Sequence, residues 1–375
     1  MIPYGKQSIN LKDRIAVFKS LKSDWLTTGP LVVDFEESLE KVVGNPTAVV
    51  SSGTAALHCA YSAIGISPGD EVITPPLTFI ATQATASLLG AKIVFADIQS
   101  ESGNINPHEV SKAITSKTKA IVAVDFAGNP ADLDELRKIA SSNNIYLIED
   151  AAHSIGSVYK AKPVGAIADL TTFSFFPTKN MTTGEGGAVS CGNENLLEKV
   201  KYFARQGLIR DPNRFQITNE GIWHQEVHDF GLNYRLPDIL CSLGISQLKR
   251  LEGFKKRRSE IYDLYKKLFQ GVSEVQLPSS RAYSDPMWHF FPIRVEARSR
   301  KQIFDSLRSA GIMVQVNYFP VHLQPVFREK GFKIGDYPVS EEFYSREISL
   351  PLHVNLTNRE VRFIVHQVKQ ALSSK

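Results

Sequence analysis

Residues 48–57 read Ala-Val-Val-Ser-Ser-Gly-Thr-Ala-Ala-Leu, a short β-branched run that passes through small residues into a helical pattern. The run predicts a buried strand, and the small residues predict a tight turn where a helix begins. Gly53 lets a ligand approach the backbone closely. The free N–H groups of the new helix and the Thr54 hydroxyl would then suit a phosphate. A plain helix cap by Ser52 or Thr54 is an equally good interpretation of this stretch alone.

The same alternation of strand and helix continues to about residue 191. Six further apolar runs predict strands, at Glu71–Pro75, Lys92–Ile98, Ala120–Phe126, Tyr146–Ala151, Thr171–Phe175 and Gly187–Cys191. Helical patterns lie between them, at Thr54–Ile64, Phe79–Leu89 and Leu133–Ser141. Strands that alternate with helices predict an α/β fold with a largely parallel sheet covered by helices.

The pattern changes at Leu236, where we expect a long and perhaps bent helix that leaves the first domain. A smaller α/β unit follows, with expected strands at Trp288–Val295 and Val314–Tyr318 and expected helices at Lys301–Ala310 and Arg359–Leu372. A length of 375 residues suits two domains. We expect a large domain at residues 1–250 and a small one at 251–375. Residues 1–35 are expected near the small domain or the substrate.

Composition excludes several classes of protein. The 43 basic and 39 acidic residues leave no electrostatic footprint for nucleic acid. No stretch approaches the roughly 20 apolar residues of a membrane span, so we expect no membrane partner. Cys59, Cys191 and Cys241 are widely spaced and form no C-x-x-C pair. Neither disulfides nor a metal site is therefore expected, and a reduced, cytoplasmic location is the simplest interpretation.

Three more features follow expected strands, where ligands of open parallel sheets bind. The carboxylate of Asp150 is suited to a cationic heterocycle, although a helix-capping aspartate is the alternative. Lys179 enters a Gly/Thr-rich turn. A partly buried lysine has a lowered pKa and forms Schiff bases, whereas an exposed loop lysine is the ordinary alternative. The Phe79 ring would stack on a flat ligand or pack in the core.

Together these features match the requirements of one cofactor. Pyridoxal 5'-phosphate requires a phosphate cradle, a stacking ring, an acidic partner for its ring nitrogen and a Schiff-base lysine. The chain offers them in the order Gly53–Thr54, Phe79, Asp150 and Lys179. The sequence therefore predicts a pyridoxal-phosphate enzyme.

Six motifs spread over nearly the whole chain resemble those of the DegT/DnrJ/EryC1/StrS family of sugar aminotransferases. They are Thr27-Thr28-Gly29-Pro30, Ser52-Gly53-Thr54-Ala55-Ala56-Leu57, Glu149-Asp150-Ala151-Ala152-His153, Thr182-Thr183-Gly184-Glu185-Gly186-Gly187, Asn233-Tyr234-Arg235 and Ser349-Leu350-Pro351-Leu352. The resemblance implies the PLP-dependent transferase fold type I (aspartate aminotransferase-like). Its large domain has a mixed seven-stranded sheet, and a smaller C-terminal α/β domain follows.

The resemblance also implies which residues hold the cofactor phosphate. Thr54, Ala55 and Ser174 would bind it, with Gly53 allowing its close approach. Asn233 would reach the phosphate in the neighbouring subunit of a homodimer, so the two sites would lie at the subunit interface. An ordinary turn residue is the alternative for Asn233.

Four residues would surround the cofactor ring by the same resemblance. Phe79 would stack on it, Asp150 would pair with the ring nitrogen, and His153 would lie beside the ring oxygen. Lys179 would carry the cofactor and move the proton during catalysis. A satisfied structural histidine is the alternative for His153.

The implied reaction moves an amino group from L-glutamate to carbon 4 of a nucleotide-linked 4-keto-6-deoxy sugar. Ile2–Gly5 and Val124–Gly128 most resemble the branch that makes the 4-amino sugar of the pseudaminic acid pathway, which implies a UDP-linked N-acetyl sugar. GDP-4-keto-6-deoxymannose is the main alternative. Expected substrate contacts are Lys6, Thr28 and Tyr318, with surface or packing roles as their alternative.

Phe176 and Asn317 depart from the family pattern, because many relatives carry His at both positions. Three other functions remain to be weighed. A dehydrating relative would have His in place of Lys179, and a nicotinamide oxidoreductase would need a G-x-G-x-x-G turn that this sequence lacks. A non-catalytic regulator would not need Lys179, Asp150 and Thr54 together.

Overall fold

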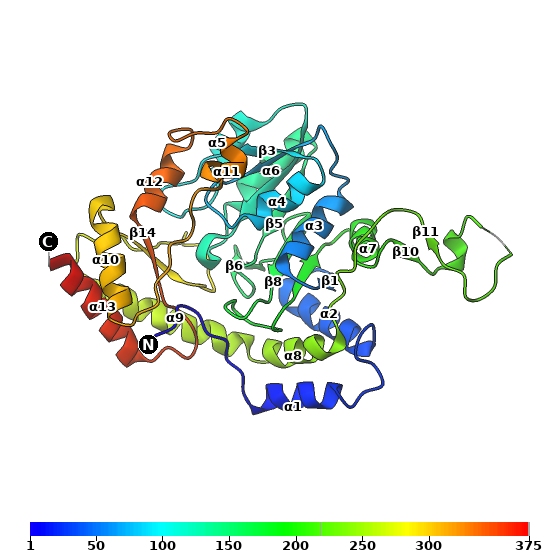
Figure 1. Ribbon diagram of the computed structural model, residues 1–375, viewed down its shortest axis with the longest axis horizontal. Coiled ribbons are helices and arrows are strands. Elements are labelled where there is room, and N and C mark those ends of the chain that lie inside the picture. Colours follow the sequence, from blue (N-terminus) through cyan, green and yellow to red (C-terminus); the bar gives the residue numbers. More distant parts are fainter. Residues whose placement is uncertain (218, 374–375) are drawn as a thin grey trace.

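The computed structural model describes residues 1–217 and 219–373, and a seven-stranded sheet lies at its centre (Figure 1). The strand order is β1-β9-β8-β5-β4-β2-β3. The strands are β1 (Thr47–Val50), β2 (Glu71–Thr74), β3 (Lys92–Phe95), β4 (Thr118–Val124), β5 (Tyr146–Asp150), β8 (Leu170–Ser174) and β9 (Gly187–Ser190). β9 runs antiparallel to both of its neighbours, β1 and β8, and the other strand pairs are parallel, so the expected mixed seven-stranded sheet is confirmed.

Helices cover both faces of this sheet. They include α3 (Gly53–Ala63), α4 (Ala81–Leu88), α5 (Pro107–Ala113), α6 (Leu133–Asn143) and α7 (Glu194–Phe203). Successive strand residues are buried on opposite faces, as the two-residue period requires. Val122 and Ile148 pack in the cluster that includes α3 and α7, whereas Ile121 and Leu147 pack in the cluster that includes α6. This double burial explains the continuously apolar strand runs of the sequence.

The expected bent helix is two helices, α8 (Asp238–Leu248) and α9 (Leu251–Leu268). Their helical geometry is interrupted at Arg250, whose φ is −115° and ψ is 1°. Helix α9 leads into the smaller unit, where β13 (Phe291–Arg294) pairs antiparallel with β14 (Glu347–Leu350). The α-helices that follow α9 are α10 (Ala297–Ser309), α11 (Pro325–Arg328), α12 (Pro338–Arg346) and α13 (Asn358–Ser373). We propose the domain boundary near residue 250, at this interruption.

The expected strand at Val314–Tyr318 is wrong. This segment makes only one bridge, between Gln315 and Ser349, and β14 takes the place beside β13. The Met313 amide pairs with the Ile2 carbonyl, and the Asn317 amide donates to the side chain of Glu347. Because distant partners take these amides, the segment forms a wall beside the small unit instead of a regular ladder.

The N-terminal segment contacts both parts of the molecule. Ile2 pairs with Ile312 of the small unit, and α1 (Leu11–Ser20) and α2 (Pro30–Val43) pack on α8. Asp13 of α1 is fully buried, where it accepts hydrogen bonds from Ser246 and Gln247 and pairs with Arg250. A buried carboxylate needs such partners, so these bonds fix where the N-terminal segment enters the site.

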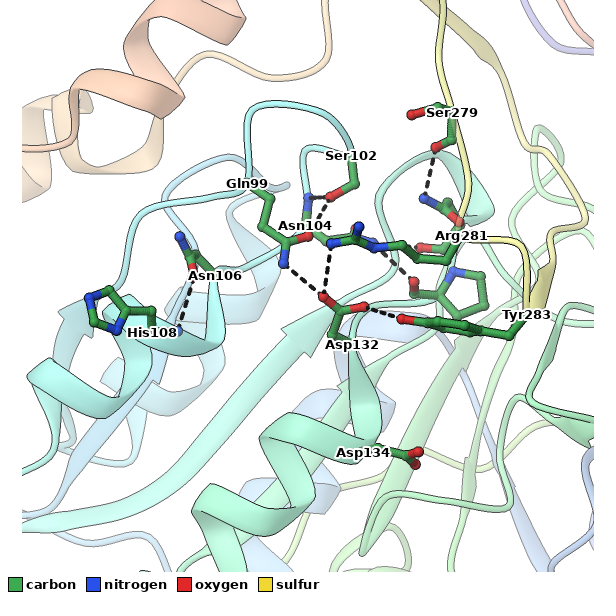
Figure 2. A network of polar contacts seen from close by, with 12 residues as sticks. Gln99, Ser102, Asn104, Asn106, His108, Asp132, Asp134, Ser279, Arg281 and Tyr283 are labelled. Atoms are coloured by element: carbon green, nitrogen blue, oxygen red, sulfur yellow. Dashed lines mark hydrogen bonds and ion pairs between the residues drawn. The ribbon is translucent and has the colours of Figure 1, made fainter.

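Short elements complete the fold. β6 (Val158–Tyr159), β7 (Lys162–Pro163) and β12 (Ser284–Asp285) form a three-stranded sheet, and β10 (Leu208–Ile209) pairs with β11 (Glu226–Val227). The β10–β11 hairpin projects away from the body in Figure 1. Figure 2 shows how the segment that leads to β12 is held, because Asp132 accepts hydrogen bonds from Gln99 and Tyr283. Among the described residues, no helix could cross a membrane.

Candidate active site

A cavity of about 430 Å³ lies at the carboxyl ends of the parallel strands. Val124, Asp150 and Ser174 end β4, β5 and β8 and line it, which is where open α/β sheets bind ligands. The other lining residues are Tyr4, Ser52, Gly53, Thr54, Leu57, Thr78, Phe79, Ala81, Thr82, Ala152, His153, Thr172, Phe173, Phe176, Thr178, Lys179, Glu185, His289, Gln315, Asn317 and Tyr318. The cavity therefore brings together most of the site residues expected from the sequence.

The start of α3 forms one side of the cavity. Ser52 caps the helix, because its hydroxyl accepts the Ala55 amide at 3.1 Å. The Ala55 amide is therefore occupied, whereas the Gly53 and Thr54 amides belong to the first turn, which has no acceptor within its own helix. Gly53 also lies close to Ser174, since a Cβ atom on it would be 2.8 Å from Ser174 Cβ. This turn meets the requirements of a phosphate-binding site.

Asp150 lies deep in the cavity and is buried. The Thr82 hydroxyl donates to its Oδ2 atom at 2.7 Å, and the Ala152 amide donates to its Oδ1 atom at 3.2 Å. Burial raises the pKa of Asp150, while these two hydrogen bonds and the charge of Lys179 lower it. The bonds hold a carboxylate pointing into the cavity, where a cationic ring nitrogen would compensate its charge.

Lys179 lies in a turn after β8, and its backbone amide bonds to Phe176 O at 2.9 Å. Burial lowers the pKa of Lys179 to about 8, and the charge of Asp150 raises it. Within the described part of the chain, the Lys179 amine makes no hydrogen bond or ion pair. An amine with a lowered pKa and no partner is available to attack a carbonyl carbon.

Aromatic rings form the remaining wall. Phe79 is 58% exposed at the cavity mouth, with its ring centroid 6.2 Å from that of Tyr318. The His153 ring stacks on His289 at 4.5 Å, and its Nε2 atom lies 3.1 Å from the Tyr318 hydroxyl. Burial holds the pKa of both histidines well below the ordinary value, so both rings are neutral at pH 7. A flat ring entering here would meet a free aromatic face and a neutral imidazole.

Four of the expected site residues, Ala55, Lys6, Thr28 and Asn233, do not line this cavity. Lys6 is exposed and borders a separate crevice next to Lys179. Thr28 and Asn233 are exposed, and Thr28 lines another crevice together with Arg235 and Arg205. Asn233 forms a backbone bridge with Arg205, so Thr28 and Asn233 are associated with one region outside the cavity.

The structure adds cavity residues that the sequence did not identify. Thr82 could have been identified from the sequence, because it lies one turn after Thr78, at the start of a helix that follows a strand. His289 lies in an apolar run that reads as core. Tyr4 and Gln315 come from segments far apart in the chain, and no local pattern marks them as neighbours.

The cavity fits pyridoxal phosphate on the evidence of its own side chains. Among the described residues, the Gly53 and Thr54 amides at the α3 turn and the Lys179 amine make no hydrogen bond, which suits the phosphate and the carbonyl carbon respectively. The hydrogen-bonded carboxylate of Asp150 suits the ring nitrogen. Phe79 offers an exposed aromatic face for the ring. These four features surround one cavity, as the cofactor requires.

Comparisons with known proteins agree with this geometry. Residues 7–369 match the model of the DegT/DnrJ/EryC1/StrS aminotransferase family. The chain is 37% identical to the UDP-4-amino-4,6-dideoxy-N-acetyl-beta-L-altrosamine transaminase of Campylobacter jejuni, over 97% of this chain and 96% of that protein. It is 34% identical to the GDP-perosamine synthase of Escherichia coli O157:H7, over 100% and 99% of the two chains.

A solved structure shows the same likeness in three dimensions. Helicobacter pylori PseC, described as an aminotransferase involved in the biosynthesis of pseudoaminic acid, superimposes with a TM-score of 0.94. It is 32% identical, and the match covers 100% of both chains. The protein therefore belongs to the DegT/DnrJ/EryC1/StrS aminotransferase family, whose members are enzymes that use pyridoxal phosphate as their cofactor.

Proposed function

We propose that this enzyme transfers the amino group of L-glutamate to carbon 4 of a UDP-linked 4-keto-6-deoxy N-acetyl amino sugar, a step of pseudaminic acid biosynthesis. The observation that carries the aminotransferase chemistry is the unpaired Lys179 amine in one cavity with the buried Asp150 carboxylate. The sugar is supported by the segments Ile2–Gly5 and Val124–Gly128 and by the 37% identity to the altrosamine transaminase.

Lys179 is proposed as the residue that carries the cofactor and moves the proton. When bound, pyridoxal phosphate supplies a carbonyl for amines and a ring that withdraws electrons from the carbon bearing the amine. The Lys179 Nζ atom would take the α proton of glutamate as base and then, as acid, would deliver it to the carbon that carried the cofactor carbonyl. Glutamate leaves as 2-oxoglutarate, and the reverse sequence places the amine on the sugar in exchange for its ketone oxygen.

The other cavity residues bind and orient the cofactor in this proposal. Asp150, held by Thr82, keeps a proton on the ring nitrogen. The Gly53 and Thr54 amides, the Thr54 hydroxyl and the Ser174 hydroxyl bind the phosphate. The Ala55 amide already bonds to Ser52, so Ala55 contributes through its place in the turn.

Phe79 and His153 are proposed as the ring contacts. Phe79 offers its exposed face at the cavity mouth, where the cofactor ring would stack. His153 is fixed by Tyr318 and His289 beside the expected ring oxygen. Tyr318 also lines the cavity and is proposed as a substrate contact.

A homodimer is proposed as the active form. Thr28 and Asn233 face solvent away from their own cavity, which suits residues that complete a partner's site. The projecting β10–β11 hairpin and the segment just after it expose large apolar side chains, with Ile222, Trp223 and Phe230 at least 77% exposed. Such side chains are usually covered by a partner surface, and a two-fold interface would make the contacts reciprocal.

The crevice residue Lys6 remains a proposed substrate contact.

We also propose a cytoplasmic location for the enzyme. All three cysteines are free and buried, which supports a reducing compartment.

The experiment that tests the substrate loads the enzyme with cofactor, adds glutamate, and offers two keto sugars in parallel. We expect mass spectrometry to show the amino product of the UDP-linked 4-keto-6-deoxy N-acetyl sugar. A clear preference for GDP-4-keto-6-deoxymannose would replace the UDP assignment and keep the aminotransferase. Failure of glutamate to convert the cofactor to its amino form would refute the proposed reaction itself.

A further inference from the structure

Four hydrogen-bonded residues connect the core of the small unit with the wall of the cavity. Glu347 and Ser349 of β14 are fully buried, and Ser349 Oγ donates to Glu347 Oε1. Asn317 Nδ2 donates to Ser349 Oγ at 2.9 Å and to the Tyr4 hydroxyl oxygen at 2.6 Å. Tyr4 and Asn317 line the cavity, whereas Glu347 and Ser349 lie behind them.

The number of hydrogens fixes the direction of these bonds. The other oxygen of Glu347 accepts the Asn317 backbone amide at 2.8 Å, so both of its oxygens are acceptors when Glu347 is ionised. Ser349 has a single hydroxyl hydrogen and gives it to Glu347, so it can only accept from Asn317. The Tyr4 oxygen also accepts from Asn317. Tyr4 therefore keeps its own hydrogen to donate, and the cavity lies beside it.

Asn317 presents a second group at the same wall. Its Nδ2 atom faces Tyr4 and Ser349, and among the described residues its Oδ1 atom accepts no hydrogen bond. A donor next to an acceptor matches a sugar hydroxyl, which can accept and donate at once. The side chains of Tyr4, Asn317 and Gln315 on this wall are uncharged, which suits a sugar better than the carboxylates of glutamate.

Glu347 is the buried end of this network of hydrogen bonds. Burial raises the pKa of Glu347 to about 8, and the bonds from Ser349 and Asn317 and the charges of Arg300 and Arg294 lower it. The bond directions given above therefore belong to the ionised form, which predominates above about pH 8. A buried carboxyl group is costly unless its oxygens are hydrogen-bonded, so replacing it disturbs both bonds at once. The network is thus held from its buried end.

We propose that Glu347 is a positioning residue for the sugar substrate, which acts through Ser349 and Asn317 to direct the Tyr4 hydroxyl hydrogen at a sugar oxygen in the cavity. Glu347 itself does not touch the substrate. The inference rests on the sugar aminotransferase function proposed above, and it assigns Tyr4 and Asn317 to the sugar and not to glutamate.

Glu347→Gln tests this with almost no change in shape. The comparison is made above about pH 8, where Glu347 is ionised and only accepts. The new amide must donate one hydrogen to Ser349 Oγ, which releases the Ser349 hydrogen, and Asn317 can accept that hydrogen only if its amide turns over to present Oδ1. With the holoenzyme, we expect the KM for the UDP-linked keto sugar to rise about three- to tenfold, as for one lost hydrogen bond. The rate of the half-reaction with glutamate should stay unchanged. Glu342→Gln is the matched control, since that side chain lies exposed on α12, and it should change neither value.

A double-mutant cycle separates positioning from a structural role. Tyr4→Phe should raise the same KM by a similar factor. Adding Glu347→Gln to Tyr4→Phe should then have little further effect, because Glu347 acts through the hydroxyl that is already gone. Ser349→Ala, which removes the middle of the network, should behave like Glu347→Gln and serves if the latter fails to fold.

Two outcomes would overturn the inference. One is an equal loss in both half-reactions, and the other is full additivity of Glu347→Gln and Tyr4→Phe. The proposed function has a separate test, because it fails only if the wild-type enzyme does not react with glutamate or with either keto sugar.

Discussion

The electrostatics of single side chains determine the chemistry of the site. Lys179 has its pKa lowered to about 8 by burial, although the charge of Asp150 works in the opposite direction. The amine is therefore neutral in a larger fraction of molecules near pH 7 than an exposed lysine would be, whose pKa is about 10.4. Asp150 keeps a negative charge nearby, so the same cavity contains a nucleophilic amine, that of Lys179, and a carboxylate, that of Asp150.

The first prediction concerns the pH dependence of Lys179. Only the neutral amine attacks a carbonyl, so covalent attachment of pyridoxal phosphate to cofactor-free enzyme should speed up as pH rises through about 8 and level off above it. In Asp150→Asn the midpoint should move to lower pH, because the charge that stabilises the ammonium is lost. Stopped-flow absorbance measures both curves. A wild-type midpoint near 10.5 would contradict the buried amine, and Lys6→Ala serves as a control that should not move the midpoint.

The second prediction is that Lys179 alone carries the cofactor. Borohydride should fix the cofactor on the peptide that contains Lys179, and peptide mass spectrometry identifies it. Lys179→Ala should lose turnover by several orders of magnitude and still bind the cofactor through its phosphate. The control is Lys160→Ala, which removes a surface lysine paired with Asp134. This variant should be labelled at Lys179, like the wild type. Labelling at any other lysine refutes the assignment.

The third prediction tests the role of the Asp150 carboxylate. Asp150→Asn preserves shape and should fold, but an amide cannot keep the ring nitrogen protonated, so turnover with glutamate should fall on the order of a hundredfold or more. Thr82→Val removes one bond to Asp150 and leaves its charge, so it should cost only about three- to tenfold. Steady-state kinetics separate the two variants, and near-normal turnover in Asp150→Asn would contradict this role.

At the scale of elements, the start of α3 shows how closely the site is packed. Gly53 leaves its amide open towards the cavity and lies against Ser174 at the end of β8. The helix and strand can approach this closely only because Gly53 has no side chain. The proposed phosphate-binding turn thus depends on the contact between two elements as well as on the helix itself.

The fourth prediction follows from that contact. In Gly53→Ala, the new Cβ would stand 2.8 Å from Ser174 Cβ, so the turn must shift. We expect a loss of about 1–3 kcal/mol in the free energy of unfolding and weaker cofactor binding. Gly253→Ala in α9 is the matched control, since nothing lies within 4 Å of its Cβ, and it should be neutral or slightly stabilising. Thermal unfolding and cofactor titration measure both, and unchanged cofactor affinity in Gly53→Ala would contradict the role of the turn.

At the scale of the whole molecule, the central question is where Thr28 and Asn233 act. Both are exposed and outside the cavity of their own chain. If each completes the partner's site, every active site needs residues from two subunits. A dimer then differs from a pair of independent enzymes in a way that mutants can reveal.

The fifth prediction uses mixed dimers. Lys179→Ala and Asn233→Ala should each be poorly active alone, and co-refolded mixtures should recover about a quarter of wild-type activity. Half of the random dimers are hybrids, and each hybrid has one site with both residues intact. Mixing Lys179→Ala with Asp150→Asn should give no recovery, because both residues belong to the same chain's site. A fully active monomer in sedimentation and kinetic assays would exclude the dimer.

The sequence by itself determined the strands and the chemistry. All seven strands of the sheet were predicted near their true positions, because strands buried on both faces are continuously apolar. Asp150, Lys179 and Gly53 were expected at one site because they follow such strands, and parallel strands bring their carboxyl ends to one edge of a sheet. The structure places all three at one cavity. These signals are local, so a sequence shows them directly.

Only the tertiary structure decided the rest. Val314–Tyr318 reads as a strand, yet it forms part of the cavity wall, because Ile2 takes the amide of Met313 just before it and the Glu347 side chain takes the Asn317 amide within it. Tyr4 and Thr82 line the site for similar reasons, and Thr28 turned out to lie outside it. The side chains that face one cavity depend on contacts between remote segments, and hydrophobic periodicity reports only how each segment meets its own neighbours.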